Sequence, residues 1–345
     1  MRKIQMRIVP WLALLAGAWF IAAPSQAQDQ PADSGQRFSP FDFGQINSIG
    51  LSLSYFDYNE DTRVDDDIQS FTEHFGKAPL ILGAPKSSES GVDFSISGGA
   101  TFYSWRNRLF LRPRAELVFG INNTYDGSTQ GEWIVDLPGD TTGMQYYSYK
   151  GKKNNVFIFA GCDLGYAPPM FKFPVVIYTG FDYKWWYRNL DITQDGTYYF
   201  GPVSNVETYS WFALPLGVLC TKPVSPDLAI GFDARMDWMF YGNMQATNNT
   251  GASDSTVDFP AVTLGNRAAF RLELFALNKG NERASTKYSA YFMYYGFGKS
   301  NTATSTTTVQ SSPGSGMEQD FFEPTSNSIV VGVAVSFDFL KKRFY

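Results

Sequence analysis

Residues 329–339 have the sequence IVVGVAVSFDF, in which two kinds of side chain alternate. One face of this segment carries large apolar side chains, namely Ile329, Val331, Val333, Val335, Phe337 and Phe339. The other face includes Gly332, Ala334, Ser336 and Asp338. A period of two with one apolar face predicts a β-strand that turns this face toward an apolar medium.

The same period recurs along most of the chain, whereas a helical period is nowhere convincing. Nine more segments show it: 48–55, 92–102, 109–121, 155–167, 175–188, 206–220, 228–240, 264–274 and 287–294. We therefore expect an all-β fold, a closed antiparallel β-barrel of about ten strands. A hairpin around 131–150 could add two strands, so twelve stays open.

The connections between these segments are of two lengths. Short turns are expected at 106–108, 168–172, 222–226 and 278–286. Long polar links are expected at 59–91, 122–154, 189–205, 243–260 and 300–326. Short turns on one rim and long loops on the other are typical of a transmembrane barrel, with periplasmic turns and extracellular loops.

A soluble β-sandwich also alternates, and two observations disfavour it. Most apolar faces are five or six residues deep, which matches the ~9–11 residues that a tilted strand needs to cross a bilayer. Aromatic residues also gather toward strand ends, as in interfacial girdles. The predicted girdle residues are Tyr183, Trp185, Tyr187 and Trp238.

The N-terminus has the features of an export signal. Arg2, Lys3 and Arg7 precede an apolar stretch, and small residues at Ser25 and Ala27 suit a cleavage site. We expect a cleaved signal peptide at 1–27, a periplasmic segment at 28–46 and the barrel at 47–345. An uncleaved membrane anchor is the alternative, but the apolar run is short for it.

The signal peptide, the ten amphipathic segments and the final strand ending in Phe339 resemble bacterial outer-membrane β-barrel proteins. The resemblance is one of pattern and covers nearly all of 47–339. It implies a Gram-negative outer-membrane location, contact with outer-membrane lipid, and recognition of a terminal strand by the assembly machinery. The residues that match this strand are Val331, Val333, Val335, Phe337 and Phe339. The chain departs from the pattern because 340–345 follow, so the signal is internal or this basic tail is a periplasmic extension.

The predicted inner faces carry nine acidic and eight basic residues, a near-balance that suits ion pairs across the lumen. The predicted ion-pair network comprises Arg112, Arg114, Glu116, Asp182, Lys184, Arg188, Asp233, Arg235, Asp237, Arg267, Arg271 and Glu273. Large side chains are expected to fill the remainder, namely Tyr103, Tyr178, Tyr209, Trp211, Tyr241, Tyr291, Met293 and Tyr295. Since barrels near eight strands are filled by side chains, we expect a plugged lumen. A narrow or gated porin is the alternative.

The chain offers few residues for catalysis or for binding metals. It has 1 His, 2 Cys and a net charge of −5, so no Cys/His zinc site, cofactor site or nucleic-acid footprint is expected. Omptin-like proteases carry an Asp-His pair late in the chain, but here His74 lies in the first long link. An acidic run from Glu60 to Asp67 could bind calcium, although its spacing lacks the EF-hand pattern.

These observations favour a non-enzymatic barrel over a porin or a loop-borne hydrolase. Its long loops would act in adhesion, recognition or envelope structure, with an extracellular ligand or a host surface as the partner. No residue pattern identifies that ligand.

Overall fold

The computed structural model describes residues 43–61, 86–104, 108–131, 145–168, 175–194, 203–250, 255–258, 260–265, 268–281, 283–308, 316–321 and 323–342. Every regular element in these ranges is a β-strand. Among the same residues, no helix is long and apolar enough to cross a membrane. The expected signal peptide and most of the segment 28–46 lie outside the described residues, and they stay predictions.

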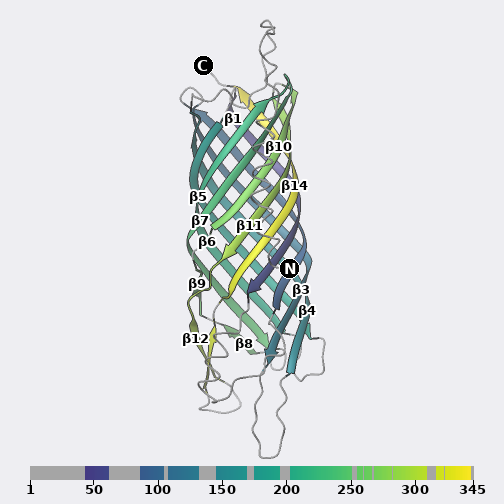
Figure 1. Cartoon of the computed structure of the whole chain (residues 1–345), viewed down its shortest axis with the longest axis vertical. Helices are drawn as coiled ribbons and strands as arrows, with labels where there is room; N and C mark the ends of the chain where they lie inside the picture. The colour runs from purple at the N-terminus through teal and green to yellow at the C-terminus, as the bar shows by residue number, and fades with distance from the viewer. Residues whose placement is uncertain are drawn as a thin grey trace, which may run out of the picture. The chain divides into compact units, whose positions relative to one another are not determined.

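Ten long antiparallel strands form a closed barrel (Figure 1). They are β1 (Phe43–Asp61), β2 (Lys86–Ser104), β3 (Leu109–Gly131), β4 (Gln145–Tyr166), β5 (Val175–Gln194), β6 (Val203–Pro223), β7 (Leu228–Thr250), β10 (Ala268–Asn281), β11 (Ala284–Phe297) and β14 (Thr325–Lys342). Each strand pairs with its neighbours, β7 pairs with β10, and β14 pairs with β1 to close the barrel. The prediction of about ten strands is confirmed.

The alternative of twelve barrel strands is wrong. Residues 145–150 continue β4 outward and pair with the end of β3, where Gly131 faces Gln145. The links at this end are therefore shorter than expected, because β2, β3, β4, β5, β6 and β7 all extend into the ranges predicted for them.

Four short strands are not part of the ten-strand barrel. β8 (Ser255–Asp258) and β9 (Val262–Thr263) pair with the outer part of β7, whereas β12 (Ala303–Thr308) and β13 (Gly316–Phe321) pair with each other. Figure 1 places β8, β9 and β12 at one end of the barrel, the lower end in the view. This end is the one that carries the long links, and we call it the outer end.

The last strand continues past Phe339. Ile46 faces Leu340, Gln45 faces Lys341 and Phe43 faces Lys342, so residues 340–342 belong to β14. The first strand accordingly begins at Phe43, four residues before the expected start of the barrel. Residues 343–345 lie outside the described part of the chain.

The barrel has an apolar outer surface and a polar interior. Large apolar side chains on the outward face are about half exposed, such as Leu53 (54%), Leu216 (64%) and Val333 (59%). Charged side chains on the inward face, such as Asp163 and Arg188, are buried. A water-soluble protein rarely exposes an apolar patch of this extent. The distribution is that of a strand wall that crosses an apolar bilayer.

Two apolar residues lie on the other face from the one expected. Phe212 pairs with Tyr241 and Ala213 with Met239, so Phe240 is an extra residue in β7 and forms a bulge. The bulge reverses the alternation, and Tyr241 is half exposed on the outside, not in the lumen. Leu264 was expected on the outward face, but it precedes β10 and is buried within the barrel.

A charge at the centre of the outward face of β14 tests the bilayer assignment. We expect Val333→Lys to lower the free energy of unfolding by about 2–4 kcal/mol, the usual cost of a lysine near the bilayer midplane. Val224→Lys is the matched control, because the exposed fraction of Val224 (52%) is similar to that of Val333 (59%) but Val224 lies in the short turn after β6. Urea titrations of the barrel in lipid vesicles measure both. Equal losses at the two positions would contradict a bilayer around β14.

Candidate functional site

The lumen is the candidate functional site, and its side chains form three layers. The inward-facing residues of β5 cross all three in order: Asp182 and Lys184, then Trp186, then Arg188. We call the layers the inner ionic cluster, the aromatic plug and the outer ionic cluster.

The inner ionic cluster lies toward the short-turn end of the barrel. It consists of Arg112, Arg114, Asp163, Asp182, Lys184, Asp233, Arg235 and Asp237, from β3, β4, β5 and β7. Four carboxylates therefore meet four basic groups. Since buried charges are costly unless they are paired, this balance makes the cluster tolerable in the lumen.

Asp163 is central to the inner ionic cluster. Its Oδ2 atom accepts hydrogen bonds from Arg112 Nε at 2.9 Å and Arg114 Nε at 3.2 Å, and its Oδ1 atom lies 4.0 Å from Arg235 Nη1. Arg112 also bonds Asp233 at 2.9 Å across 121 positions of sequence. Hydrogen bonds between ionised groups are the stronger kind, so the cluster joins opposite walls of the barrel firmly.

A second charged set lies beside the inner cluster. Lys287 Nζ is 2.6 Å from Glu273, whereas Arg271 is 3.4 Å from Glu273 and 3.9 Å from Glu116. A polar cavity of about 180 Å³ separates these groups from the small side chains of β1, β2 and β14. This volume has room for several water molecules.

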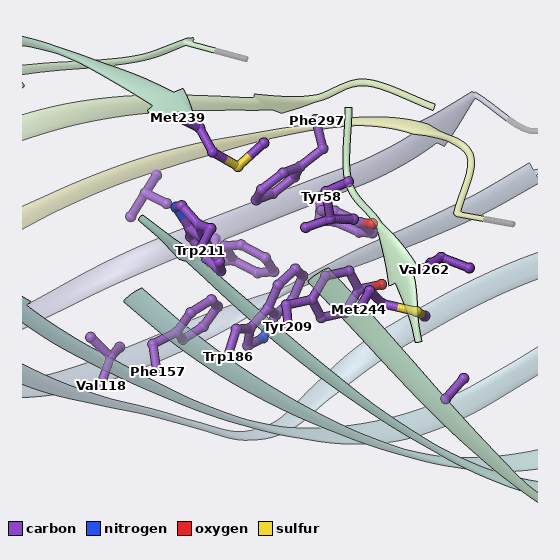
Figure 2. Close-up of a cluster of buried hydrophobic side chains, with 14 of the residues drawn as sticks. Tyr58, Val118, Phe157, Trp186, Tyr209, Trp211, Met239, Met244, Val262 and Phe297 are labelled. Atoms are coloured by element: carbon purple, nitrogen blue, oxygen red, sulfur yellow. The ribbon is translucent and has the colours of Figure 1, made fainter. Parts of the chain in front are cut away.

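The aromatic plug fills the middle of the lumen (Figure 2). The Trp186 ring stacks on Phe157 at 4.9 Å and on Tyr209 at 4.8 Å between ring centroids, and it meets Tyr58 edge-on at 5.3 Å. Trp211 and Phe297 extend the plug with an edge contact at 5.2 Å. A cavity of about 30 Å³ lies among these rings, enough for a water molecule or two. The rings therefore pack closely against one another across this part of the lumen.

The outer ionic cluster lies beyond the plug. It consists of Glu60, Glu89, Lys153, Arg188, Glu207 and Glu323. Arg188 contacts Glu60 at 3.2 Å and bonds Glu207, and Lys153 bonds Glu89. The Arg188 guanidinium also lies 4.5 Å from the Tyr58 ring and 4.8 Å from the Trp186 ring. These cation–π contacts connect the outer cluster to the plug.

Glu323 is the member of the outer cluster that lies outside the strands, just before β14. Its Oε1 atom accepts hydrogen bonds from the hydroxyls of Tyr209 at 2.8 Å and Tyr58 at 3.2 Å. Burial raises the pKa of its carboxyl group well above the usual glutamate value, and the negative charges of Glu60 and Glu207 raise it further.

The structure brings most of the predicted network together, but in separate clusters. Seven of the twelve residues are in the inner ionic cluster, while Glu116, Arg271 and Glu273 form the second set and Arg188 is in the outer cluster. Arg267 and His74 lie outside the described residues. The network prediction did not include Asp163, Glu60, Glu89, Lys153 or Glu323. Glu60 is the first residue of the acidic run from Glu60 to Asp67, and its carboxylate contacts Arg188 in the lumen.

The predicted girdle residues lie on the outward faces of β5 and β7. The ring centroids of Tyr183 and Phe212 are 5.1 Å apart, and those of the stacked Trp185 and Tyr187 rings are 6.0 Å apart. The Trp238 side chain is 60% exposed. Their location at the bilayer interface stays a prediction. Within the described residues, no group of three or more His, Cys, Asp or Glu is arranged to hold a metal ion.

The barrel is of the outer-membrane type. Ten-strand closure, an apolar outer surface and a charged lumen together carry this assignment. No family model and no curated protein matches the chain.

Solved structures that resemble the chain are bacterial membrane proteins of low sequence identity. The outer membrane protease OmpT from Escherichia coli has 8% identity and a TM-score of 0.49, over 89% of this chain and 100% of OmpT. The toluene transporter TodX from Pseudomonas putida has 10% identity and a TM-score of 0.36, over 95% and 93%. The transport unit of the autotransporter AIDA-I from Escherichia coli has 9% identity and a TM-score of 0.30, over 95% and 97%. These likenesses do not assign an activity to the chain.

Proposed function

We propose that this protein is a non-enzymatic bacterial outer-membrane barrel with a closed lumen. It presents its outer strand ends and loops for adhesion, recognition or envelope structure. The observation that carries the proposal is the aromatic plug, which leaves about 30 Å³ between two clusters of buried charges. A lumen filled in this way supports a rigid wall and does not offer a path for solutes.

The lengths of the strands support surface presentation. β3 and β7 have 23 residues each and β4 has 22, whereas a tilted strand crosses the hydrocarbon core in ~9–11 residues. The excess length continues at the outer end, where β8 and β9 pair with β7. The outer strand ends thus form an ordered platform on which the loops are mounted.

The proposal includes the protein's location and partners. Export by the N-terminal signal would deliver the chain to the outer membrane of a Gram-negative bacterium, where lipid contacts the apolar belt and the assembly machinery receives β14. The partner outside the cell would be a ligand or a host surface. The proposed function requires no cofactor.

A narrow or gated porin is the second candidate. The polar cavity of about 180 Å³ in the inner half of the lumen favours it, because the cavity is lined by charged and small polar residues. Conduction would require movement of the aromatic plug above this cavity.

Planar-bilayer recording distinguishes the two candidates. We expect the purified, folded protein to give no stable conductance steps, because in the proposed closed barrel the aromatic plug blocks the aqueous path. A heat-modifiable shift on gels confirms that the inserted protein is folded. Reproducible steps that scale with salt concentration would contradict the closed barrel and support the porin.

A further inference from the structure

The outer ionic cluster contains more acidic than basic groups. Four glutamates, Glu60, Glu89, Glu207 and Glu323, are close to two basic side chains, Lys153 and Arg188. Lys153 and Arg188 are buried, as are Glu89, Glu207 and Glu323. Among the described residues, four ionised carboxylates would leave two negative charges without counter-charges in a poorly hydrated site. This arrangement is costly unless a proton or a cation neutralises the excess.

The hydroxyl group of Tyr209 indicates where a proton is held. This oxygen is 2.8 Å from Glu323 Oε1 and 3.1 Å from Glu207 Oε2, and it accepts a hydrogen bond from Arg188 Nη1 at 2.9 Å. A tyrosine hydroxyl has one hydrogen, so it cannot donate to both carboxylates at once. A proton on one of the two carboxyl groups supplies the missing donor.

Of these two carboxyl groups, Glu323 is the better holder of the proton. Glu207 bonds Arg188 directly, so its negative charge has a counter-charge in contact with it. Glu323 has tyrosine hydroxyls as its hydrogen-bond partners and no ion pair with Lys or Arg in the described part of the chain. A buried carboxyl group that has no direct ion pair stays protonated more readily than one that has.

Glu323 also connects the outer cluster to the chain that carries β12 and β13. Its backbone N–H donates to Ser300 Oγ at 2.8 Å, and the Ser300 N–H donates to the Glu323 carbonyl at 3.0 Å. Ser300 follows β11, and Glu323 precedes β14. These bonds join the two stems of the β12–β13 hairpin, and the side chain of Glu323 ties both stems to the barrel wall.

We propose that Glu323 is a proton-dependent latch, which in its protonated form fixes the base of the β12–β13 hairpin to the mouth of the barrel. Loss of the proton places a charge beside Glu60 and Glu207 and expels the side chain. The hairpin stems are then released from the tyrosines. The groups that face Glu323 are Tyr58 and Glu60 of β1, Arg188 of β5, and Glu207 and Tyr209 of β6.

The direction of the pH dependence follows from the raised pKa of Glu323. The folded protein holds this proton over a range of pH in which an unfolded chain has lost it. Stabilisation by the latch is therefore complete below the usual glutamate pKa of about 4.3 and declines as the pH rises toward the raised value. The latch is closed in acid and open in alkali.

Hydrogen exchange of the intact barrel in lipid nanodiscs tests the latch. The measured amide is that of Ser300, whose sequence neighbours are the same in every variant, so that its intrinsic exchange rate cancels when variants are compared with the wild type at the same pH. Glu323→Gln keeps the shape of the protonated side chain and should hold the latch closed at every pH. At about pH 9 we expect exchange in the wild type to be about tenfold faster than in E323Q, and at about pH 5 to be equal.

Two further variants complete the test. Glu323→Ala removes the side chain and should give fast exchange at both pH values. Glu273→Gln is the matched control, because it makes the same chemical change in the second charged set beside Lys287, and it should leave the Ser300 amide unchanged. A ratio of wild type to E323Q that does not vary with pH would overturn the proposal.

Infrared spectroscopy of the wild type gives an independent test that needs no change in stability. A protonated carboxylic acid has a C=O stretch distinct from that of a carboxylate. We expect the wild type to show this band above about pH 7, where carboxyl groups of ordinary pKa are ionised, and to lose it as the pH is raised further; E323Q should lack the band over this range. A spectrum of E323Q that retains the titrating band assigns the proton to another group, and the absence of any band in the wild type indicates that a cation neutralises the cluster. Either result would overturn the latch.

Discussion

Asp163→Ala is expected to lower the free energy of unfolding by about 3–5 kcal/mol, the usual cost of removing one partner from a buried set of charges. Asp163 is fully buried and contacts Arg112, Arg114 and Arg235. Without it, three guanidinium groups face one another with fewer counter-charges in the lumen. Urea titration of the barrel in lipid vesicles, followed by heat-modifiable migration on gels, measures the loss.

Two variants separate the effect of charge from that of shape. Asp163→Asn keeps the size of the side chain and one acceptor oxygen but removes the negative charge, so we expect a smaller loss than for alanine. Asp227→Ala is the surface control, since Asp227 is exposed in the short turn between β6 and β7, and its effect should stay within about 0.5 kcal/mol. Equal effects of D163A and D227A would show that the inner ionic cluster contributes no net stability.

The parts of the strands that contact the bilayer could be predicted from the sequence, whereas the parts at the outer end could not. Lipid requires an apolar outward face, so segments such as 329–339 and 109–121 alternate clearly and their faces were assigned correctly. At the outer end both faces of a strand can be polar. Residues 86–90 and 145–154 therefore show no apolar period, although they belong to β2 and β4.

The candidate site could be predicted only in part, for a related reason. Alternation identifies which charges face inward, and their near-balance indicates ion pairs. The pairing itself depends on strand stagger and closure, as in the bond from Arg112 of β3 to Asp233 of β7. Glu89 and Lys153 were missed because they lie in strand ends that lack the apolar period. Tyr241 was misplaced because a bulge reverses the faces without leaving a signal in the sequence.

The three layers of the lumen also depend on one another. The aromatic plug separates the ionic clusters from each other, and its rings provide the cation–π faces on which Arg188 lies. Arg188 in turn pairs with the glutamates that surround the Glu323 latch. A change in the plug should therefore also affect the ionic cluster beside it, and Trp186 is the residue to change because it contacts both the neighbouring rings and Arg188.

Trp186→Ala is expected to cost about 3–5 kcal/mol of stability, as is usual for a buried aromatic residue replaced by alanine. Trp186 stacks on Phe157 and Tyr209, contacts Phe56 and Tyr58, and donates from Nε1 to Asn155 at 3.0 Å. Its removal joins new space to the existing cavity of about 30 Å³ and leaves Asn155 Oδ1 without this donor. We therefore also expect W186A to give conductance events in planar bilayers that the wild type does not show.

Trp238→Ala is the matched control, because it removes the same side chain from the outward face of β7, where Trp238 is 60% exposed. The variant should stay silent in planar bilayers, since the lumen is unchanged. If W186A loses stability but remains silent, the remaining rings have closed over the space, and the double variant W186A/W211A should then conduct, because Trp211 packs against Phe297 on another side of the plug. Silence of the folded double variant would show that the aromatic rings do not form the barrier, and closure would then have to reside in the ionic clusters at either side.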